Sequence, residues 1–209
     1  MDQPLLSPEQ VSWGTEPAER ADAARNRRLL LATAREMLAA DGADKLTMDG
    51  LADRAGLGKG TVFRRFGTRA GIFRALLDDA ERSFQELVLT GPPPLGPGAP
   101  PLDRLVAYGR ARIGFLIEHR DIARATLDGS EPIPAGSRTP MSQLHIRVLL
   151  GQMDIGPADL DMLAVQLSAA LDGPLLLYLS ADDLAEPAPR TAERIARAWH
   201  DLIRRACRP

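Results

Sequence analysis

Apolar residues recur three and four positions apart through most of the chain, which is the spacing that gives an α-helix one buried face. Such stripes cover residues 22–41, 48–55, 59–66, 72–87, 102–117, 141–149, 159–179 and 192–206, and a shorter helix is expected over 121–127. No segment shows the alternation of apolar and polar residues that predicts a strand. The pattern therefore predicts an all-α fold of about nine helices.

Prolines and glycines mark the breaks between these helices. The segment from Gly91 to Pro101 contains six prolines and three glycines, so we expect a surface loop there, and DGSEPIPAGSRTP is a second predicted loop. Pro174 follows Gly173 within the stripe over 159–179. Because proline lacks a backbone donor and clashes with the preceding turn, we expect one kinked helix at this point.

The stretch LTMDGLADRAGLGKGTVFRRF, from Leu46 to Phe66, predicts two short helices joined by a tight turn. Thr47 stands at the expected N-cap of the first helix. The apolar face of that helix consists of Met48, Leu51, Ala52 and Ala55. Gly56 follows directly, and glycine tolerates the positive φ that turns the chain into the next helix. In the second helix the inward positions are Val62 and Phe66, and the outward ones are Lys59, Thr61, Arg64 and Arg65. This arrangement predicts a helix-turn-helix whose outward face suits DNA.

Charge is unevenly distributed, although the net charge of the whole chain is only -2. Residues 20–74 contain 12 arginines and lysines against 6 acidic residues, whereas residues 75–209 contain 14 against 18. A basic module on an acidic body is typical of proteins that bind a polyanion at one end, and chance asymmetry on solvated helices is the alternative. We expect a disordered tail over 1–19, a DNA-binding domain over 20–68 and a helical body over 69–209.

The residue content argues against several other kinds of chemistry. The single cysteine, Cys207, cannot form an intramolecular disulfide or a cysteine-rich zinc site. The histidines at 119, 145 and 200 lack metal-ligand spacing, and no nucleophile triad, phosphate loop or dinucleotide fingerprint is present. No apolar run approaches about 18 residues, and no secretion signal opens the sequence. We therefore expect no metal, no cofactor, no enzymatic activity and no membrane span, in a soluble protein of the cytoplasm.

The order of residues in the N-terminal module resembles the TetR family of bacterial transcriptional regulators. The resemblance is carried by Leu46-Thr47-Met48, by LADRAGL from Leu51, by KGTVF from Lys59, and by Phe66 and Arg69. It extends over roughly residues 25–75, whereas the body is similar only in size and helical layout. Membership of this family implies a homodimer whose first three helices bind an operator and whose body, residues 69–209, binds a small-molecule effector and forms the dimer interface.

The predicted DNA-binding residues are Thr47, Lys59, Gly60, Thr61, Phe63, Arg64, Arg65 and Arg69. Arg64 and Lys59 are candidates for base or backbone contacts, because either could donate to guanine O6 and N7. The resemblance assigns phosphate contacts to Thr47, Gly60, Thr61 and Arg69. Phe63 departs from the family, in which tyrosine is frequent at this position and its hydroxyl contacts a phosphate. Arg65 stands where histidine is frequent, and we expect this added cation to offset the lost hydroxyl.

A second and more polar stripe shares the helix that begins near Leu102. This stripe, the aromatic seam, consists of Tyr108, Arg112, Phe115 and His119. It could face Met141, His145 and Gln166 of neighbouring helices, and the seven residues together have the mostly apolar composition of a ligand pocket. Ordinary core aromatics with hydrogen-bonded edges are the alternative. An inward-pointing Arg112 would favour an acidic or carbonyl-bearing effector.

The last two helices carry apolar stripes that are wider than one intramolecular neighbour requires. The residues concerned are Leu163, Leu167, Leu171, Ile195, Trp199 and Leu202. They predict a two-fold, four-helix interface between two copies of the chain, and a buried internal helix pair is the alternative. A dimer would set two recognition helices about 34–36 Å apart, so it would bind a palindrome.

Together these features predict a ligand-responsive transcriptional regulator, most simply a repressor that a small-molecule effector releases from a palindromic operator. The expected partners are a double-stranded DNA operator, an effector of unknown identity and a second copy of the chain. The alternative is a protein-interaction adaptor that keeps the fold without reading DNA.

Overall fold

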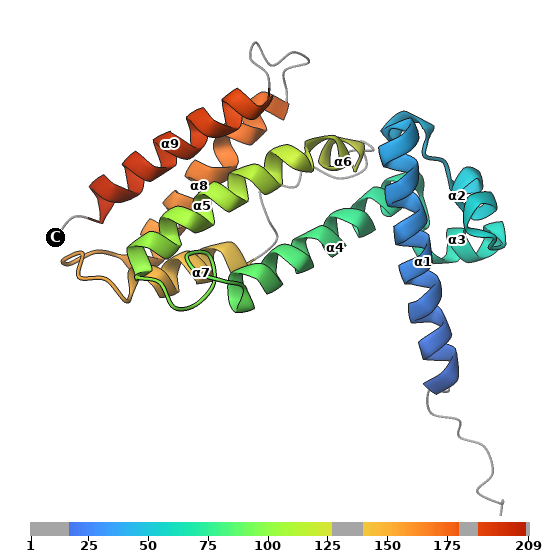
Figure 1. Cartoon of the computed structure of the whole chain (residues 1–209), viewed down its shortest axis with the longest axis horizontal. Coiled ribbons are helices and arrows are strands. Elements are labelled where there is room, and N and C mark those ends of the chain that lie inside the picture. Colours follow the sequence, from blue (N-terminus) through green and yellow to red (C-terminus); the bar gives the residue numbers. More distant parts are fainter. Residues whose placement is uncertain (1–16, 127–139, 180–187, 208–209) are drawn as a thin grey trace, which may run out of the picture. The chain divides into compact units, whose positions relative to one another are not determined.

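The computed structural model describes residues 17–126, 140–179 and 188–207. Within these ranges the chain forms nine α-helices and one short 3-10 turn, with no strand, so the predicted all-α fold is confirmed (Figure 1). The chain divides into two compact units, Met1–Gly67 and Thr68–Pro209, which we call unit 1 and unit 2. Most of the predicted tail and of the loop DGSEPIPAGSRTP lies outside the described residues.

Unit 1 consists of α1 (Pro17–Asp41), the 3-10 turn η1 (Ala43–Lys45), α2 (Met48–Ala55) and α3 (Lys59–Phe66). α1 begins at Pro17, inside the segment predicted as a tail, because proline at the first helical position has a suitable φ and its missing N–H has no helical partner there. α2 packs against both α1 and α3. The buried apolar side chains of unit 1 are Leu30, Leu31, Ala34, Met37, Leu46, Leu51, Ala52 and Val62.

The turn between α2 and α3 has the structure that the sequence predicts. The hydroxyl of Thr47 caps α2 by accepting a hydrogen bond from the backbone N–H of Gly50 at 3.0 Å. Gly56 ends α2 with φ at +66°, a conformation that would strain a residue with a side chain. α3 begins three residues later at Lys59 and ends at Phe66, where Gly67 follows as the C-cap with φ at +70°. The cap and the two glycines therefore fix the ends of the two short helices.

Within the described residues, unit 2 contains α4 (Arg69–Thr90), α5 (Pro101–Glu118), α6 (Arg120–Ala125), α7 (Pro140–Leu150), α8 (Leu160–Leu179) and α9 (Ala188–Ala206). α5 packs against α6, α7, α8 and α9, and most closely against α9. α7 packs against α8, and α4 packs against α6. α8 continues through Pro174 as one helix rather than two, as predicted, and the kink stays a prediction. None of the described helices combines the length and the apolar character that crossing a membrane requires.

α5 and α9 approach closely where Gly109 meets Trp199. A β-carbon added at Gly109 would lie 1.9 Å from Nε1 of Trp199. That nitrogen donates a hydrogen bond to the carbonyl oxygen of Leu105 at 3.2 Å, and the indole is buried. The glycine is therefore needed for packing, because any larger residue at position 109 would displace the indole.

The buried face of α7 differs from the one that the apolar pattern predicts. The buried side chains are Ser142, Ile146, Leu149 and Leu150. Leu144 and Val148, which the pattern places on the inner face, are instead 51% and 45% exposed. Because α7 has apolar residues on both sides, spacing alone does not determine which side packs against α8.

Candidate nucleic-acid interface and body pocket

α3 directs one side into unit 1 and the other into solvent. Val62 is fully buried and Phe66 is half-buried, so these two side chains hold the helix against its unit. The exposed residues Lys59, Gly60, Phe63 and Arg64 form what we name the α3 surface. In the part of the chain that the structure describes, Arg64 has no ion-pair or hydrogen-bond partner. The α3 surface therefore offers an uncommitted guanidinium to a partner molecule.

Lys59 is held in place by an acidic residue of α2. Its Nζ lies 2.9 Å from Oδ2 of Asp49, and this hydrogen bond and the negative charge of Asp49 raise the pKa of Lys59 above its ordinary value. The two side chains are 64% and 66% exposed. An ion pair this open to water contributes little to stability, so a phosphate group could replace Asp49 at small cost.

The other predicted residues of unit 1 are Arg65, Thr47 and Thr61, and the first two make hydrogen bonds within the unit. Nη2 of Arg65 donates to the carbonyl oxygen of Ala23 in α1 at 2.9 Å, which ties α3 to α1. The oxygen of Thr47 accepts the capping hydrogen bond from Gly50, although its hydroxyl hydrogen remains able to donate to a phosphate. Thr61 is half-buried. The predicted cation at position 65 therefore has a structural partner inside unit 1.

Arg69, the last of the predicted DNA-binding residues, belongs to unit 2. It is the first residue of α4, and its guanidinium carbon lies 4.9 Å from the centre of the Phe73 ring. The hydroxyl of Thr68 caps this helix by accepting from the N–H of Gly71 at 3.1 Å. The start of α4 is thus fixed by a cap and by a cation–π contact.

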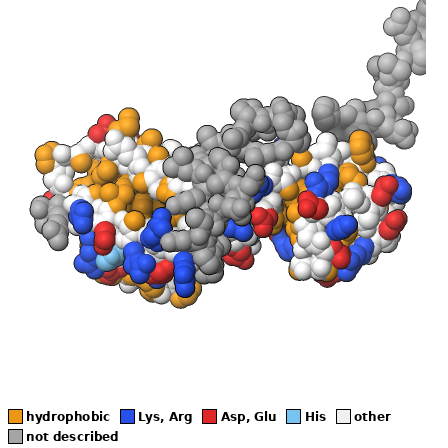
Figure 2. Space-filling model, turned by 90° about the horizontal axis from the view of Figure 1, so that it is seen from above, with side chains coloured by type: hydrophobic (Ala, Val, Ile, Leu, Met, Phe, Trp, Pro, Cys, Tyr) orange, Lys and Arg blue, Asp and Glu red, His pale blue; other side chains and the backbone are white. Residues whose placement is uncertain are grey.

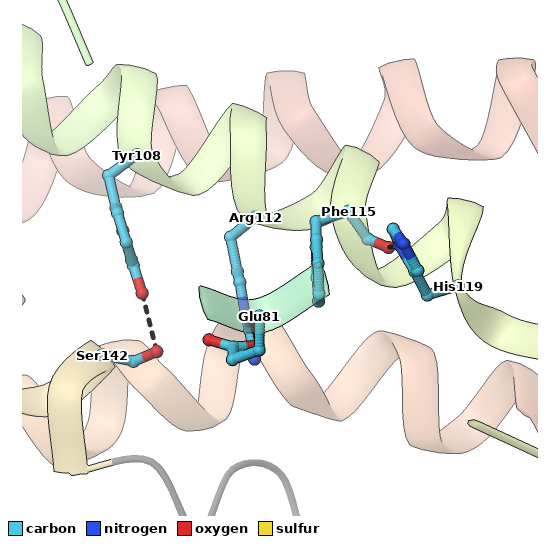
Figure 3. Close-up of polar contacts among 6 residues, drawn as sticks. All are labelled: Glu81, Tyr108, Arg112, Phe115, His119 and Ser142. Atoms are coloured by element: carbon cyan, nitrogen blue, oxygen red, sulfur yellow. Dashed lines mark hydrogen bonds and ion pairs between the residues drawn. The ribbon is translucent and has the colours of Figure 1, made fainter. Parts of the chain in front are cut away.

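In unit 2, the polar members of the aromatic seam already have partners (Figure 3). Tyr108 donates a hydrogen bond to Oγ of Ser142 in α7 at 2.7 Å, and burial raises the pKa of its phenol. Arg112, which is 4% exposed, donates to Oε2 of Glu81 in α4 at 2.6 Å. Figure 3 shows both side chains pointing from α5 towards the neighbouring helices. The charge of Arg112 is therefore neutralised by a residue of the same chain.

The other two seam residues pack among aromatic rings. The rings of Phe115 and His119 stack with their centres 4.3 Å apart, and Phe84 lies 5.2 Å from Phe115. The guanidinium of Arg112 lies over the Phe115 ring at 5.0 Å. Nδ1 of His119 is 2.8 Å from the carbonyl oxygen of Phe115. This half of the seam corresponds to the alternative interpretation, aromatic core residues with hydrogen-bonded edges.

A small hollow, open to solvent, lies between α4, α5 and α7, and the centre of a water molecule could occupy about 20 Å³ of it. Its walls are formed by Glu81, Phe84, Gln85, Val88, Leu89, Tyr108, Met141, Ser142 and His145. Three of the predicted effector-binding residues, Tyr108, Met141 and His145, are therefore brought together. The predicted residues Arg112, Phe115 and His119 do not line it, and Gln166 is exposed on α8.

Besides Tyr108, two titratable groups in this region have shifted pKa values. Burial, with a contribution from the positive charge of Arg104, lowers the pKa of His145 to about 4, so its ring is neutral at pH 7. Among the described residues, Nε2 of His145 is buried without a hydrogen-bond partner. Burial also raises the pKa of Asp172 in α8, although the nearby Arg112 opposes the shift. Nε of Arg104 is also buried without a partner among the described residues, so the region contains two unsatisfied polar nitrogens.

The residues that the sequence interpretation missed are Glu81 and Ser142. Glu81 lies within the apolar stripe of α4, four residues after Leu77 and three before Phe84, so a charge in a buried stripe could have indicated a buried partner. Ser142 carries no comparable signal, because a small hydroxyl is common on either side of a helix.

The predicted interface residues of α8 and α9 fall into two groups. Leu167, Leu171 and Trp199 are each 3% exposed and lie in the core of unit 2. Leu163 and Ile195 are half-buried against the same core, and Leu202 is 40% exposed. Among the described side chains of α8, the large apolar ones that are exposed are Met162 and Val165, at 53% and 43%. On the face of the body seen in Figure 2, hydrophobic side chains lie beside arginines and acidic residues.

A family model described as bacterial regulatory proteins, tetR family, matches residues 30–76. The matched range contains α2, α3 and the turn between them. A curated relative, the DNA-binding transcriptional repressor TetR of Mycobacteroides abscessus, is 39% identical over 59 residues. The matched segment covers 28% of this chain and 31% of the relative, so the chain spans about a third of the relative's length.

Solved structures of regulators have the same fold over most of their length. A TetR-family transcriptional regulator from Pectobacterium atrosepticum superposes with a TM-score of 0.67 at 20% identity, covering 91% of this chain and 98% of that one. A TetR/AcrR-family regulator from Thermobifida fusca has a TM-score of 0.58 at 18% identity, covering 85% and 97%. At such identities the likeness shows the fold alone. The family match itself covers residues 30–76, so it is this segment, with α2, α3 and the turn between them, that is similar to bacterial regulatory proteins of the tetR family.

Proposed function

We propose that this protein is a ligand-responsive transcriptional repressor that binds a palindromic DNA operator as a homodimer. The α3 surface is the observation that carries the proposal. α3 is fixed to its unit by Val62 and by the hydrogen bond from Arg65 to Ala23, yet it exposes Phe63 and Arg64 on its outer side. A short helix held in this way can enter the major groove without first being ordered. The name of the curated relative, a DNA-binding repressor, supports repression.

In the proposed complex the residues of unit 1 have separate roles. Arg64 donates to guanine O6 and N7, because its planar guanidinium matches these two acceptors. Lys59 exchanges Asp49 for a phosphate, and Thr47 donates its hydroxyl hydrogen to another. Phosphate contacts of this kind fix the register of the protein on the duplex, whereas base contacts determine the sequence that is bound.

The effector site in this proposal is the pocket beside Tyr108, Met141 and His145. Glu81 of α4 lines that pocket, and its carboxylate accepts a hydrogen bond from Arg112 of α5. A ligand that displaced Glu81 from Arg112 would shift α4, which is joined to α3 through Gly67 and Thr68. Effector and DNA would then favour different conformations, and each would lower the affinity for the other.

A second copy of the chain is the proposed partner of the body. Met162 and Val165 of α8 and Leu202 of α9 are the exposed apolar side chains available on these two helices among the described residues. To bind a palindrome, such a dimer must present two α3 surfaces to successive major grooves, about 34–36 Å apart. Sedimentation at micromolar concentration should give a dimer, and a monomer would contradict this part of the proposal.

Selection of bound sequences from a random duplex pool tests the proposal as a whole. We expect enrichment of one palindromic sequence whose binding weakens as salt is raised, because counterions are released from the phosphates on binding. A consensus without two-fold symmetry would contradict the dimer but not the reading of DNA. A pool that remains random after repeated rounds would favour the adaptor alternative.

A further inference from the structure

The side chain of Phe63 is the most solvent-exposed large hydrophobic group in the part of the chain that the structure describes, at 66%. Its exposure is not needed for the packing of α3, because Val62 and Phe66 on the other side already hold the helix. A phenyl ring in water is unfavourable, and burying it would release the water around it. The described residues therefore leave most of this ring open to a partner.

The surroundings of Phe63 leave room for a large partner to approach. Gly60 lies three residues earlier on the same side of α3, and a β-carbon added there would have nothing within 4 Å. Arg64 follows directly and is exposed, while Lys59 lies one turn earlier with its Nζ held by Asp49. The ring thus stands between two cations beside a stretch of bare backbone, on a surface suited to a polyanion.

The chemistry of a phenyl ring restricts what it can recognise on DNA. It has no donor or acceptor, so it cannot bind a phosphate or form a hydrogen bond with a base edge. Among the groups that base pairs present in the major groove, only the methyl group of thymine is apolar. We infer that Phe63 is a specificity-determining residue that packs against the C5-methyl group of a thymine in each operator half-site. The inference rests on the proposed DNA-binding function and assigns one base preference within it.

The test removes one methyl group at a time from the DNA. On the duplex obtained by selection, each thymine is replaced in turn by deoxyuridine, which lacks only that methyl, and the affinity of the full-length protein is measured. We expect the affinity to fall by about four-fold when the methyl group is removed at one particular position in each half-site, and to change little at the other thymines. Phe63→Ala should bind the thymine and deoxyuridine duplexes equally, whereas Phe63→Leu should keep the difference because it retains an apolar side chain.

The outcomes distinguish this inference from the function on which it rests. If the protein binds no duplex more tightly than random DNA, the proposed function itself fails. If it binds the selected duplex but no thymine methyl matters, or if Phe63→Ala keeps the sensitivity, the assignment of Phe63 is overturned. A change in oligomeric state in Phe63→Ala, with the methyl sensitivity unchanged, would also overturn it and would identify the ring as a protein contact. Because Phe63 is exposed, each variant should unfold at the wild-type temperature, and this is checked first.

Discussion

α3 of unit 1 and α5 of unit 2 each carry an arginine close to a phenylalanine, and they use the two side chains in opposite ways. On α3, Phe63 and Arg64 are exposed, and Arg64 has no partner among the described residues. On α5, Arg112 and Phe115 are 4% and 8% exposed, and the arginine is bound to Glu81. The comparison shows that residue type alone does not identify a binding site. An arginine with a buried carboxylate partner serves the fold, and one without a partner is available for a ligand.

The same difference predicts where substitutions affect stability and where they affect binding. Burying a charge is unfavourable unless it is paired and hydrogen-bonded. Each substitution on the inner side of α5 should therefore lower the free energy of unfolding. Substitutions at the exposed positions of α3 should leave the free energy of unfolding almost unchanged and should alter only the affinity for DNA.

The largest expected effect is that of Arg112→Met. It leaves the Glu81 carboxylate half-buried without its partner, so we expect the free energy of unfolding to fall by about 3 to 5 kcal/mol in urea titrations. Arg64→Met, the matched change on α3, should stay within about 0.5 kcal/mol of wild type. The double variant Glu81→Leu with Arg112→Met should recover most of the loss. Equal losses for the two single arginine variants would remove the distinction between the helices.

Gly109→Ala should have the next largest effect. The added methyl group would overlap Trp199, and overpacking of this kind costs about 1 to 3 kcal/mol. Gly114→Ala is the control within the same helix, because a β-carbon there has nothing within 4 Å. That variant should gain up to about 1 kcal/mol from the higher helix propensity of alanine. Thermal unfolding of the two variants side by side measures the difference, and a stable Gly109→Ala would contradict the close packing of α5 against α9.

The body should lose stability as the pH falls. The pKa of His145 is lowered to about 4 in the folded chain from 6.5, so the unfolded chain binds a proton more readily between these values. The stability associated with the neutral ring is present above pH 6.5 and declines as the pH falls towards 4, by about 1 to 2 kcal/mol between pH 7 and 5. The raised pKa of Asp172 opposes this change. In His145→Gln the loss of stability between pH 7 and 5 should be smaller than in wild type. If the variant and wild type lose stability equally, His145 has the same pKa in the folded and unfolded chain.

Gly60→Ala should have the smallest effect on stability and should separate folding from binding. Alanine favours the helix by up to about 1 kcal/mol, and the structure has room for its β-carbon. If the duplex approaches the backbone of α3 at this point, the same methyl group should weaken operator binding. In Gly60→Ala the unfolding temperature should therefore rise while the affinity for the operator duplex falls. In Gly114→Ala only the unfolding temperature should change. A Gly60→Ala protein that binds the operator as wild type does would place the duplex elsewhere.

The helix-turn-helix could be predicted almost to the residue because its determinants are local. Thr47 caps α2 through a residue three positions away, and Gly56 adopts a positive φ that its own lack of a side chain permits. The body was less predictable because its contacts join distant parts of the chain. Glu81 and Arg112 are 31 positions apart, and Tyr108 and Ser142 are 34 apart, so neither spacing nor periodicity reveals them.

The width of an apolar stripe was a poor guide to what lies outside the chain. Leu167, Leu171 and Trp199 have the spacing of an interface, but they lie in the core beside α5. Arg65 shows the same limit on α3, since an outward-looking arginine turns back to the carbonyl oxygen of Ala23. In both cases the partner comes from another element, and only the three-dimensional arrangement determines the side that is covered.

The central claim, that the exposed side of α3 reads DNA sequence, is tested most directly with Arg64→Ala. The measurement is the ratio of affinities for the selected operator and for a scrambled duplex of equal length, at one salt concentration, for wild type and variant. A bidentate contact to guanine is worth about 1 to 3 kcal/mol of discrimination, so the ratio should fall about ten-fold or more while the affinity for the scrambled duplex changes little. An equal loss of affinity on both duplexes would contradict the claim, because Arg64 would then contribute only charge.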